Sequence, residues 1–176
     1  MKQRIMTFSS IALAMMLLTP ALWAAHKTEE AASVLQRIEA NALDIRSHAG
    51  RLQTFARQPQ MVSWETHAFE ISRIRHATND MAELLGEFKD LKPHATERQN
   101  KAFNVLVPKA EKLSDNAEKA IKIVNQEKQK LEVGHPDYEK TVSALYDGAD
   151  NIVAAVGLAE SWDEVREARK ELFSKK

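Results

Sequence analysis

The sequence contains no cysteine, few glycines and few aromatic residues, and its positive and negative charges balance. Without cysteine the chain cannot form a disulfide, a thiolate zinc site, a covalent c-type haem attachment or a cysteine nucleophile. Five glycines and 6% aromatic residues are too few for the turns and hairpins of a β sandwich or barrel. With 25 basic and 25 acidic residues there is no surplus of positive charge to bind nucleic acid.

The N-terminus has the layout of a secretory signal peptide. Lys2 and Arg4 precede an apolar run over residues 6–18, and a Thr-Pro break and small residues follow. We predict that residues 1–24 are a cleaved signal peptide, so that the protein is exported to the periplasm or the extracellular medium. An uncleaved membrane anchor is the alternative, because residues 5–25 are just long enough to span a bilayer. After cleavage we expect no stable membrane insertion.

The rest of the chain, residues 25–176, is predicted to form a single all-α domain. Apolar side chains return every seven residues in four segments, as in long amphipathic helices that pack on one another. Short breaks between long helices make neighbours antiparallel, so we predict an up-down-up-down four-helix bundle. An extended coiled coil that dimerises is the alternative, and we expect a monomer or a homodimer. The four helices are expected at about 28–57, 63–91, 93–131 and 136–160.

Two rows of residues in each segment, each with a step of seven, are expected to face the core. The rows are Ala31, Ile38, Ile45, Leu52 beside Leu35, Ala42, Ala49, Ala56; Trp64, Ile71, Thr78, Leu85 beside His67, Ile74, Met81, Phe88; Phe103, Ala110, Ala117, Val124, Leu131 beside Leu106, Leu113, Ala120; and Tyr138, Leu145, Ile152, Ala159 beside Val142, Ala149, Val156.

Local signals refine the second and third helices. Ser63 suits the N-cap of the second helix, and Pro93 suits the first turn of the third. Pro108 lies inside the third segment, where a proline removes a backbone hydrogen bond and collides with the preceding turn. We therefore predict a kink near residues 104–108, or two helices placed end to end.

The fourth segment contains further signals. Gly148 and Gly157 weaken a helix, which indicates a closely packed neighbour or a local bend. Ser161, followed by Glu164, has the pattern of a capping box. We therefore predict a short C-terminal helical extension over residues 162–173, separate from the fourth helix.

Several residues near the start of the second segment are candidates for a structural or functional role. Phe55, Trp64 and Phe69 are expected to form an aromatic core layer at one end of the bundle. Asn79 is expected to be an interior polar group that fixes the register of the helices. A ligand pocket between the helices is the alternative for Trp64, together with His67.

His67 is the strongest candidate for a functional residue, since its row places it inside the bundle. Burial lowers the pKa of an imidazole, and the neutral ring can bind a metal ion or haem iron. The favoured interpretation is a core histidine hydrogen-bonded to a facing polar group, so His67→Leu is expected to fold. Met81 is fourteen residues away, or about 21 Å along the helix, and cannot share an iron with His67. The candidate pocket residues are Trp64, His67 and Met81.

Patterns for catalysis are missing from the sequence. A di-iron bundle needs two Glu-x-x-His motifs, and only Glu132-x-x-His135 fits, at a loop. There is no zinc-protease, nucleophile-elbow, P-loop or dinucleotide-binding motif. We therefore predict a non-enzymatic exported bundle that acts in envelope interactions or small-ligand binding, with no catalytic or metal-ligating residues. The alternative is a non-covalent haem b or metal carrier that uses His67.

Three short motifs carry a resemblance to known proteins. They are Trp64-x-x-His67-Ala68, Asn79-x-Met81 and Leu106-x-Pro108, and Pro93 and Asn125 accompany them. With these motifs, most of the chain resembles a set of uncharacterised exported bacterial α-helical bundle proteins. The resemblance implies a helical bundle and a bacterial envelope setting, and it implies no chemistry.

The chain also resembles cytochrome b562-type bundles, but only in its expected fold. Those proteins take an axial histidine from near the end of their last helix. No residue after His135 is histidine here. The resemblance therefore does not extend to haem binding.

Overall fold

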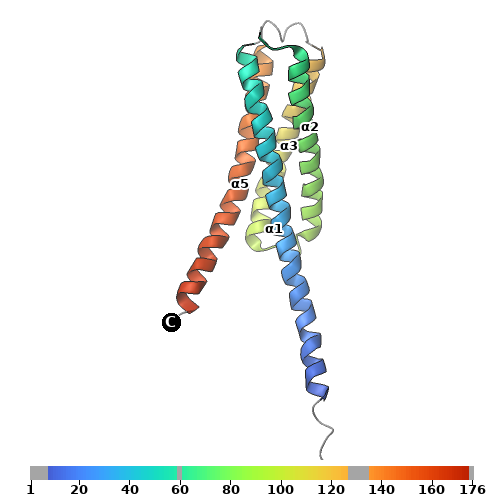
Figure 1. The fold of residues 1–176 in the computed structure, drawn as a ribbon, viewed down its shortest axis with the longest axis vertical. Helices are drawn as coiled ribbons and strands as arrows, with labels where there is room; N and C mark the ends of the chain where they lie inside the picture. The colour runs from blue at the N-terminus through green and yellow to red at the C-terminus, as the bar shows by residue number, and fades with distance from the viewer. Residues whose placement is uncertain (1–7, 59–60, 127–134, 175–176) are drawn as a thin grey trace, which may run out of the picture.

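The computed structural model describes residues 8–58, 61–126 and 135–174, with side chains described for 23–58, 61–126 and 135–158. Within these ranges the chain forms four helices and no strands, which confirms the predicted all-α four-helix bundle (Figure 1). The helices are α1 (Phe8–Arg57), α2 (Trp64–Leu91), α3 (Glu97–Gln126) and α5 (Pro136–Ser174).

The helices pack in a ring. Helix α2 packs on α1 and α3, and α5 closes the ring because it packs on both α3 and α1. Helices α1 and α3 face each other across the diagonal and touch little. Consecutive helices run in opposite directions, as the short connections require (Figure 1). The chain is therefore the predicted up-down-up-down bundle.

The predicted rows form the core of this bundle. Every row residue whose side chain is described is buried, except three that are partly buried and pack at the edge: Ala56, Trp64 and Leu85. Ile38 and Leu106 are completely inaccessible to solvent. Burying an aliphatic side chain of this size contributes about 1.5 to 3 kcal/mol relative to leaving it exposed. The rows are therefore the main source of the stability of the fold.

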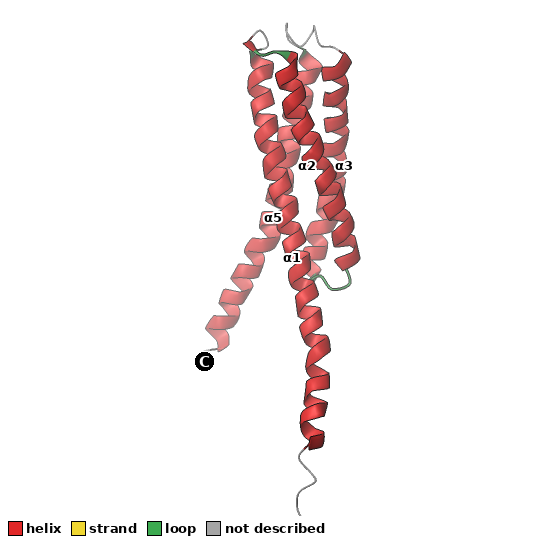
Figure 2. Cartoon of the chain, turned by 45° about the vertical axis from the view of Figure 1, so that its right-hand side comes forward, coloured by secondary structure: helices red, strands yellow, loops and turns green. Residues whose placement is uncertain are grey.

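Helix α1 is longer than predicted, because it begins at Phe8 and continues through the predicted cleavage position without a break. Its N-terminal part projects beyond the ends of α2 and α3 (Figure 2). Trp23 is exposed, and Ala31 is the first residue of the chain in the described core. The described core of α1 thus begins after residue 24, the predicted cleavage position.

The connection between α2 and α3 differs from the prediction. Pro93 lies in the connecting turn, so its expected place in the first turn of a helix is wrong. A capping box fixes the start of α3 at Glu97 instead: the Gln99 amide donates to Thr96 Oγ1 at 3.2 Å, and the Thr96 amide donates to Gln99 Oε1 at 2.7 Å. These reciprocal bonds satisfy two backbone N–H groups that would otherwise lack a partner at the start of the helix. Helix α3 therefore begins after Thr96 and not at Pro93.

The same connection is tied to α1. Thr28 Oγ1 donates to the carbonyl oxygen of His94 at 2.7 Å, and Gln99 Nε2 donates to the carbonyl oxygen of Thr28 at 3.3 Å. The ring of His94 also meets Trp23 edge-on, with centroids 4.8 Å apart. These contacts hold α1 around Trp23 and Thr28 against the bundle.

Helix α3 passes through Pro108 as a single helix, so the prediction of two helices end to end is wrong. Pro108 and Asn104 are both exposed, so water can reach the carbonyl group that the missing proline N–H leaves without a partner. A kink at residues 104–108 stays a prediction. The predicted end of this helix, with Leu131, lies outside the described residues.

Helix α5 contains the predicted extension without a break. Residues 162–173 are helical, but they continue α5, so the predicted restart at Ser161 is wrong. No proline follows to interrupt the helix. The C-terminal part of α5 diverges from the other helices in both views (Figures 1 and 2). Row residue Ala159 lies outside the side chains that are described.

The two glycines of α5 have different surroundings. A Cβ atom at Gly148 would lie 3.1 Å from Leu113 Cδ1, so this glycine allows the close approach of α3 that the sequence indicated. A Cβ atom at Gly157 would meet no described atom within 4 Å. Close packing therefore explains only Gly148.

Candidate functional site

The His67 side chain lies in the interior, where the sequence placed it. Its Nδ1 atom is hydrogen-bonded to the Tyr138 hydroxyl at 2.9 Å, across the diagonal from α2 to α5. The Phe55 ring meets the imidazole edge-on, with centroids 5.7 Å apart. Burial lowers the pKa of His67, since protonation would place a charge in a dry interior. Burial also raises the pKa of Tyr138, and the nearby Glu70 carboxylate adds to that rise.

These contacts fit a core histidine better than a ligand to iron. His67 is only 1% exposed, and two aromatic rings pack against it. Its Nε2 atom has no hydrogen-bond partner among the described atoms. Trp64 lies one turn before His67, whereas Met81 lies about 21 Å further along α2. The structure therefore does not bring the three candidate pocket residues together.

A second buried polar cluster joins α1 to α2. Glu70 Oε2 accepts hydrogen bonds from His48 Nδ1 and, at 3.0 Å, from Arg51 Nε. His48 Nε2 lies 3.4 Å from Asp44 Oδ1. His48 and Glu70 are both buried, while Arg51 is about half exposed. No group of three or more potential metal-ligating residues was found among the described side chains. The cluster therefore acts as a polar tie between two helices.

The two apolar rows do not reveal this cluster, because α1 and α2 each have a third row beside them. On α1 this row contains Val34 and His48, and on α2 it contains Glu70 and Leu84, again with steps that are multiples of seven. The buried Val34 and Leu84 mark both rows as interior. A polar residue on such a row is a signal for a buried polar pair.

Two expectations near this cluster are wrong. Asn79 is exposed on α2, and its neighbour Thr78 is the buried polar residue, with its hydroxyl donating to the Ile74 carbonyl at 2.7 Å. Phe69 is 57% exposed, so it takes no part in an aromatic core layer. It packs instead under the guanidinium of Arg73, 5.6 Å from the ring centre.

Replacing His67 by leucine tests the core interpretation. The variant should fold, but at pH 8 it should be about 1 to 2 kcal/mol less stable, because the Tyr138 hydroxyl loses its buried partner. Because its pKa is lowered on folding, His67 binds a proton more readily in the unfolded chain. The wild type therefore loses stability as the pH falls below the ordinary histidine value of about 6.5. Urea titrations should show a smaller difference in the free energy of unfolding between wild type and variant at pH 5 than at pH 8.

The matched control for this change is Tyr138→Phe combined with His67→Leu. Removing both partners leaves no orphaned polar group, so the double variant should be more stable than the sum of the single effects predicts. Additive effects, or a His67→Leu variant that does not fold, would contradict the interpretation.

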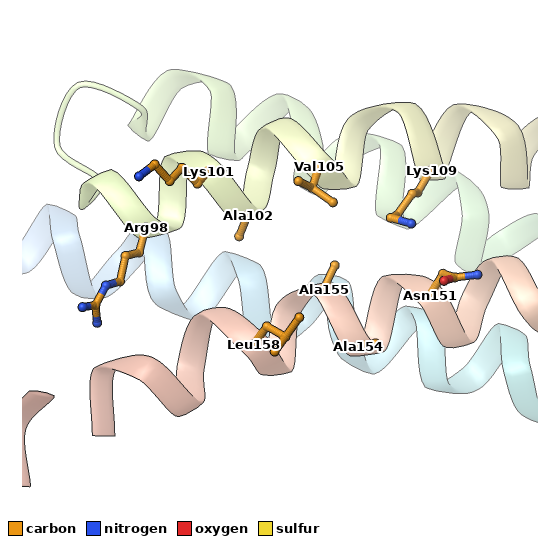
Figure 3. Close-up of a pocket in the computed structure, with 9 residues that line it drawn as sticks. All are labelled: Arg98, Lys101, Ala102, Val105, Lys109, Asn151, Ala154, Ala155 and Leu158. Carbon is orange, nitrogen blue, oxygen red and sulfur yellow. The ribbon is translucent and has the colours of Figure 1, made fainter. Parts of the chain in front are cut away.

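A groove of about 490 Å³ lies on the surface between α3 and α5, and none of the residues in the His67 and His48 clusters lines it (Figure 3). Its walls are mainly apolar. Val105 on α3 and Leu158 on α5 are large apolar residues that stay 48% and 62% exposed. The alanines between them have small side chains, which leave the floor of the groove open. The lining residues are Arg98, Lys101, Ala102, Val105, Lys109, Asn151, Ala154, Ala155 and Leu158.

The charged residues that line this groove, among those the structure describes, are all positive. Lys101 forms an exposed ion pair with Glu97 at 2.7 Å. Lys109 is half-buried at the other end, opposite Asn151 (Figure 3). It forms no ion pair or hydrogen bond within the portion of the chain that is described. The groove thus combines an apolar floor with a cation that has no partner among the described residues.

A hollow between α1 and α2 has a different character. It is lined by several charged residues, and Arg37 and Glu87 form an ion pair across it at 3.0 Å. Its charges are therefore partly satisfied within the protein. In the groove between α3 and α5 of Figure 3, Lys109 has no ion pair among the described residues, and we take this groove as the candidate functional site.

In comparisons with known proteins, no family model, curated protein or solved structure matches this chain. In the helices that the structure describes, no stretch is both long and apolar enough to cross a membrane. The groove between α3 and α5 is thus the main structural indication of a function.

Proposed function

We propose that this protein is an exported, non-enzymatic helical bundle that holds a small amphipathic molecule in the groove between α3 and α5. The carrying observation is the groove itself. Its volume of about 490 Å³ is within the range of small-molecule sites, and its walls are apolar with few polar groups. Exposed Val105 and Leu158 on its walls gain stability when a ligand covers them.

The geometry of α1 supports export. Ala24 and Ala25, which flank the proposed cleavage position, are both exposed. The described core begins only at Ala31, and Thr28 is already held by the connection between α2 and α3. Cleavage after Ala24 would therefore remove the contact of Trp23 with His94 but leave the described core and the Thr28 hydrogen bond in place. The intact mass of protein from the exported fraction tests this step, since it must lack residues 1–24.

The chemistry of the lining supports binding rather than catalysis. Among the described residues, no histidine, carboxylate or hydroxyl side chain that could serve as a general base or a nucleophile lines the groove. The two histidine clusters lie in the interior and on other helix faces. A binding role needs only the apolar floor and the positive charges that are present.

A haem or metal carrier is the second candidate, and one observation favours it. His67 Nε2 is buried without a partner in the described interior, and an imidazole nitrogen of this kind can ligate iron. The packed rings of Phe55 and Tyr138 oppose it, because haem needs space beside that nitrogen. Absorption spectra and metal analysis after haem reconstitution decide the matter, and a Soret band lost in His67→Leu would establish this role.

Filling the groove should abolish ligand binding. Ala155→Trp places a large ring on the groove floor. Nile red, a neutral apolar dye, should bind the wild type with raised fluorescence and bind this variant at least about tenfold more weakly, because its contact area is lost. Fluorescence titration measures the change, and circular dichroism checks the fold.

The control for this experiment is Ala82→Trp on an exposed position of α2, which should bind the dye as the wild type does. Val105→Glu is a second groove variant at an exposed position, where a charge does not threaten the core. Unchanged dye binding in both groove variants would refute the proposed function.

A further inference from the structure

The charge of Lys109 gives information about the ligand. Its side chain is half-buried at one end of the apolar groove, and no described acid neutralises it. Lys101, by contrast, is exposed and already paired with Glu97. An ammonium group that is partly removed from water and has no partner favours the arrival of an anion.

We propose that the ligand is a long-chain aliphatic carboxylate whose carboxylate group binds Lys109. This inference rests on the proposed function of the groove. Lys109 and Asn151 face each other across the groove, so the carboxylate can accept from the ammonium and from a free amide hydrogen of Asn151 (Figure 3). The aliphatic chain then runs past Val105 toward Leu158.

The dimensions of the groove set the length of that chain. Lys109 and Arg98 mark its two ends and are eleven residues apart on α3, which corresponds to about 16 Å. An extended chain of about a dozen carbons has this length. Each added methylene should strengthen binding by up to about fourfold until the chain reaches the end of the groove, and little beyond that.

A small anion fits these observations better than a partner helix or a second copy of the chain. The groove is only about three helical turns long, which offers little area to a helix. The positive side chains lie at the ends of the groove and not along one side. The head group of a single small molecule needs positive charge at one end only. The single negative charge of an aliphatic carboxylate can pair with Lys109. Its aliphatic chain adds no further charge over the alanines of the groove floor, where such a charge would have no partner.

The test compares two detergents with the same tail and opposite charge. Dodecanoate and dodecyltrimethylammonium, both below their micelle concentrations, are titrated calorimetrically into the protein as purified after expression of the whole chain. Dodecanoate should bind one to one, and the cation at least about tenfold more weakly. Lys109→Gln should weaken dodecanoate binding about tenfold and leave the cation unchanged, because only the carboxylate uses that charge.

Lys119→Gln is the matched control, since Lys119 is exposed on the same helix and lies outside the groove. It should bind dodecanoate as the wild type does. Equal binding of both detergents, or no effect of Lys109→Gln, would overturn the carboxylate assignment while Nile red still reports a working groove. A dimer that Ala155→Trp dissolves would show that a second copy fills the groove, which overturns the assignment as well.

Discussion

Ile38→Asp is expected to unfold the bundle at room temperature. Ile38 lies on α1 with none of its surface exposed, and no basic residue lies in its apolar row. Burying an uncompensated charge there costs more than about 4 kcal/mol, in addition to the lost apolar packing. Because a domain of this size is stable by about 5 to 15 kcal/mol, little or no folded protein should remain. Loss of helical circular dichroism and of a cooperative melt measures the effect.

The control is Leu43→Asp on the same helix, where the side chain is 40% exposed and the charge can stay in water. It should melt within a few degrees of the wild type. Leu113→Asp on α3, where the side chain is 1% exposed, should behave as Ile38→Asp does. If Ile38→Asp kept a native melt, the packing described for α1 would be wrong.

Glu70→Ala should have the second largest effect, a loss of about 2 to 3 kcal/mol in the free energy of unfolding. The change removes the acceptor shared by His48 and Arg51 and leaves the buried imidazole without that partner. Arg51 can turn to water, which keeps the loss below that of a fully buried pair. Urea denaturation followed by circular dichroism measures it.

Glu83→Ala provides the comparison, because Glu83 lies on the same helix and is exposed. Its effect should stay within about 0.5 kcal/mol, as for most surface substitutions. Equal losses in the two variants would show that the cluster of His48, Arg51 and Glu70 does not tie α1 to α2.

The fold could be predicted because its main cause is repeated along the sequence. Ile38 and Ile45 on α1, and Leu106 and Leu113 on α3, recur every seven residues and all lie in the core. Such a repeat follows from helix geometry alone and does not depend on the neighbours. Helix boundaries depend on a few hydrogen bonds, as at Thr96, and were therefore predicted less well.

The partner of His67 could not be identified from the sequence. Its burial followed from its row, but Tyr138 lies 71 positions further along the chain and on the opposite corner of the bundle. Only the order of the helices around the ring brings the two side chains together. The same holds for Glu70, whose partners on α1 depend on the rotation of α1 against α2.

The groove could not be predicted because the pattern of seven reports which residues face the core and says nothing of the outer surface. Val105 and Leu158 fall outside the rows and look like isolated exposed apolar residues, which are common on any protein. Lys109 is one of 25 basic residues. Only the packing of α3 on α5 places these residues around one hollow.

The most direct measurement of the central claim is the NMR spectrum of methyl-labelled protein titrated with dodecanoate. The account predicts that shift changes concentrate on the methyl groups of Ala102, Val105, Ala155 and Leu158, which line the groove. Changes centred on residues around His67, or spread evenly over all four helices, would contradict it.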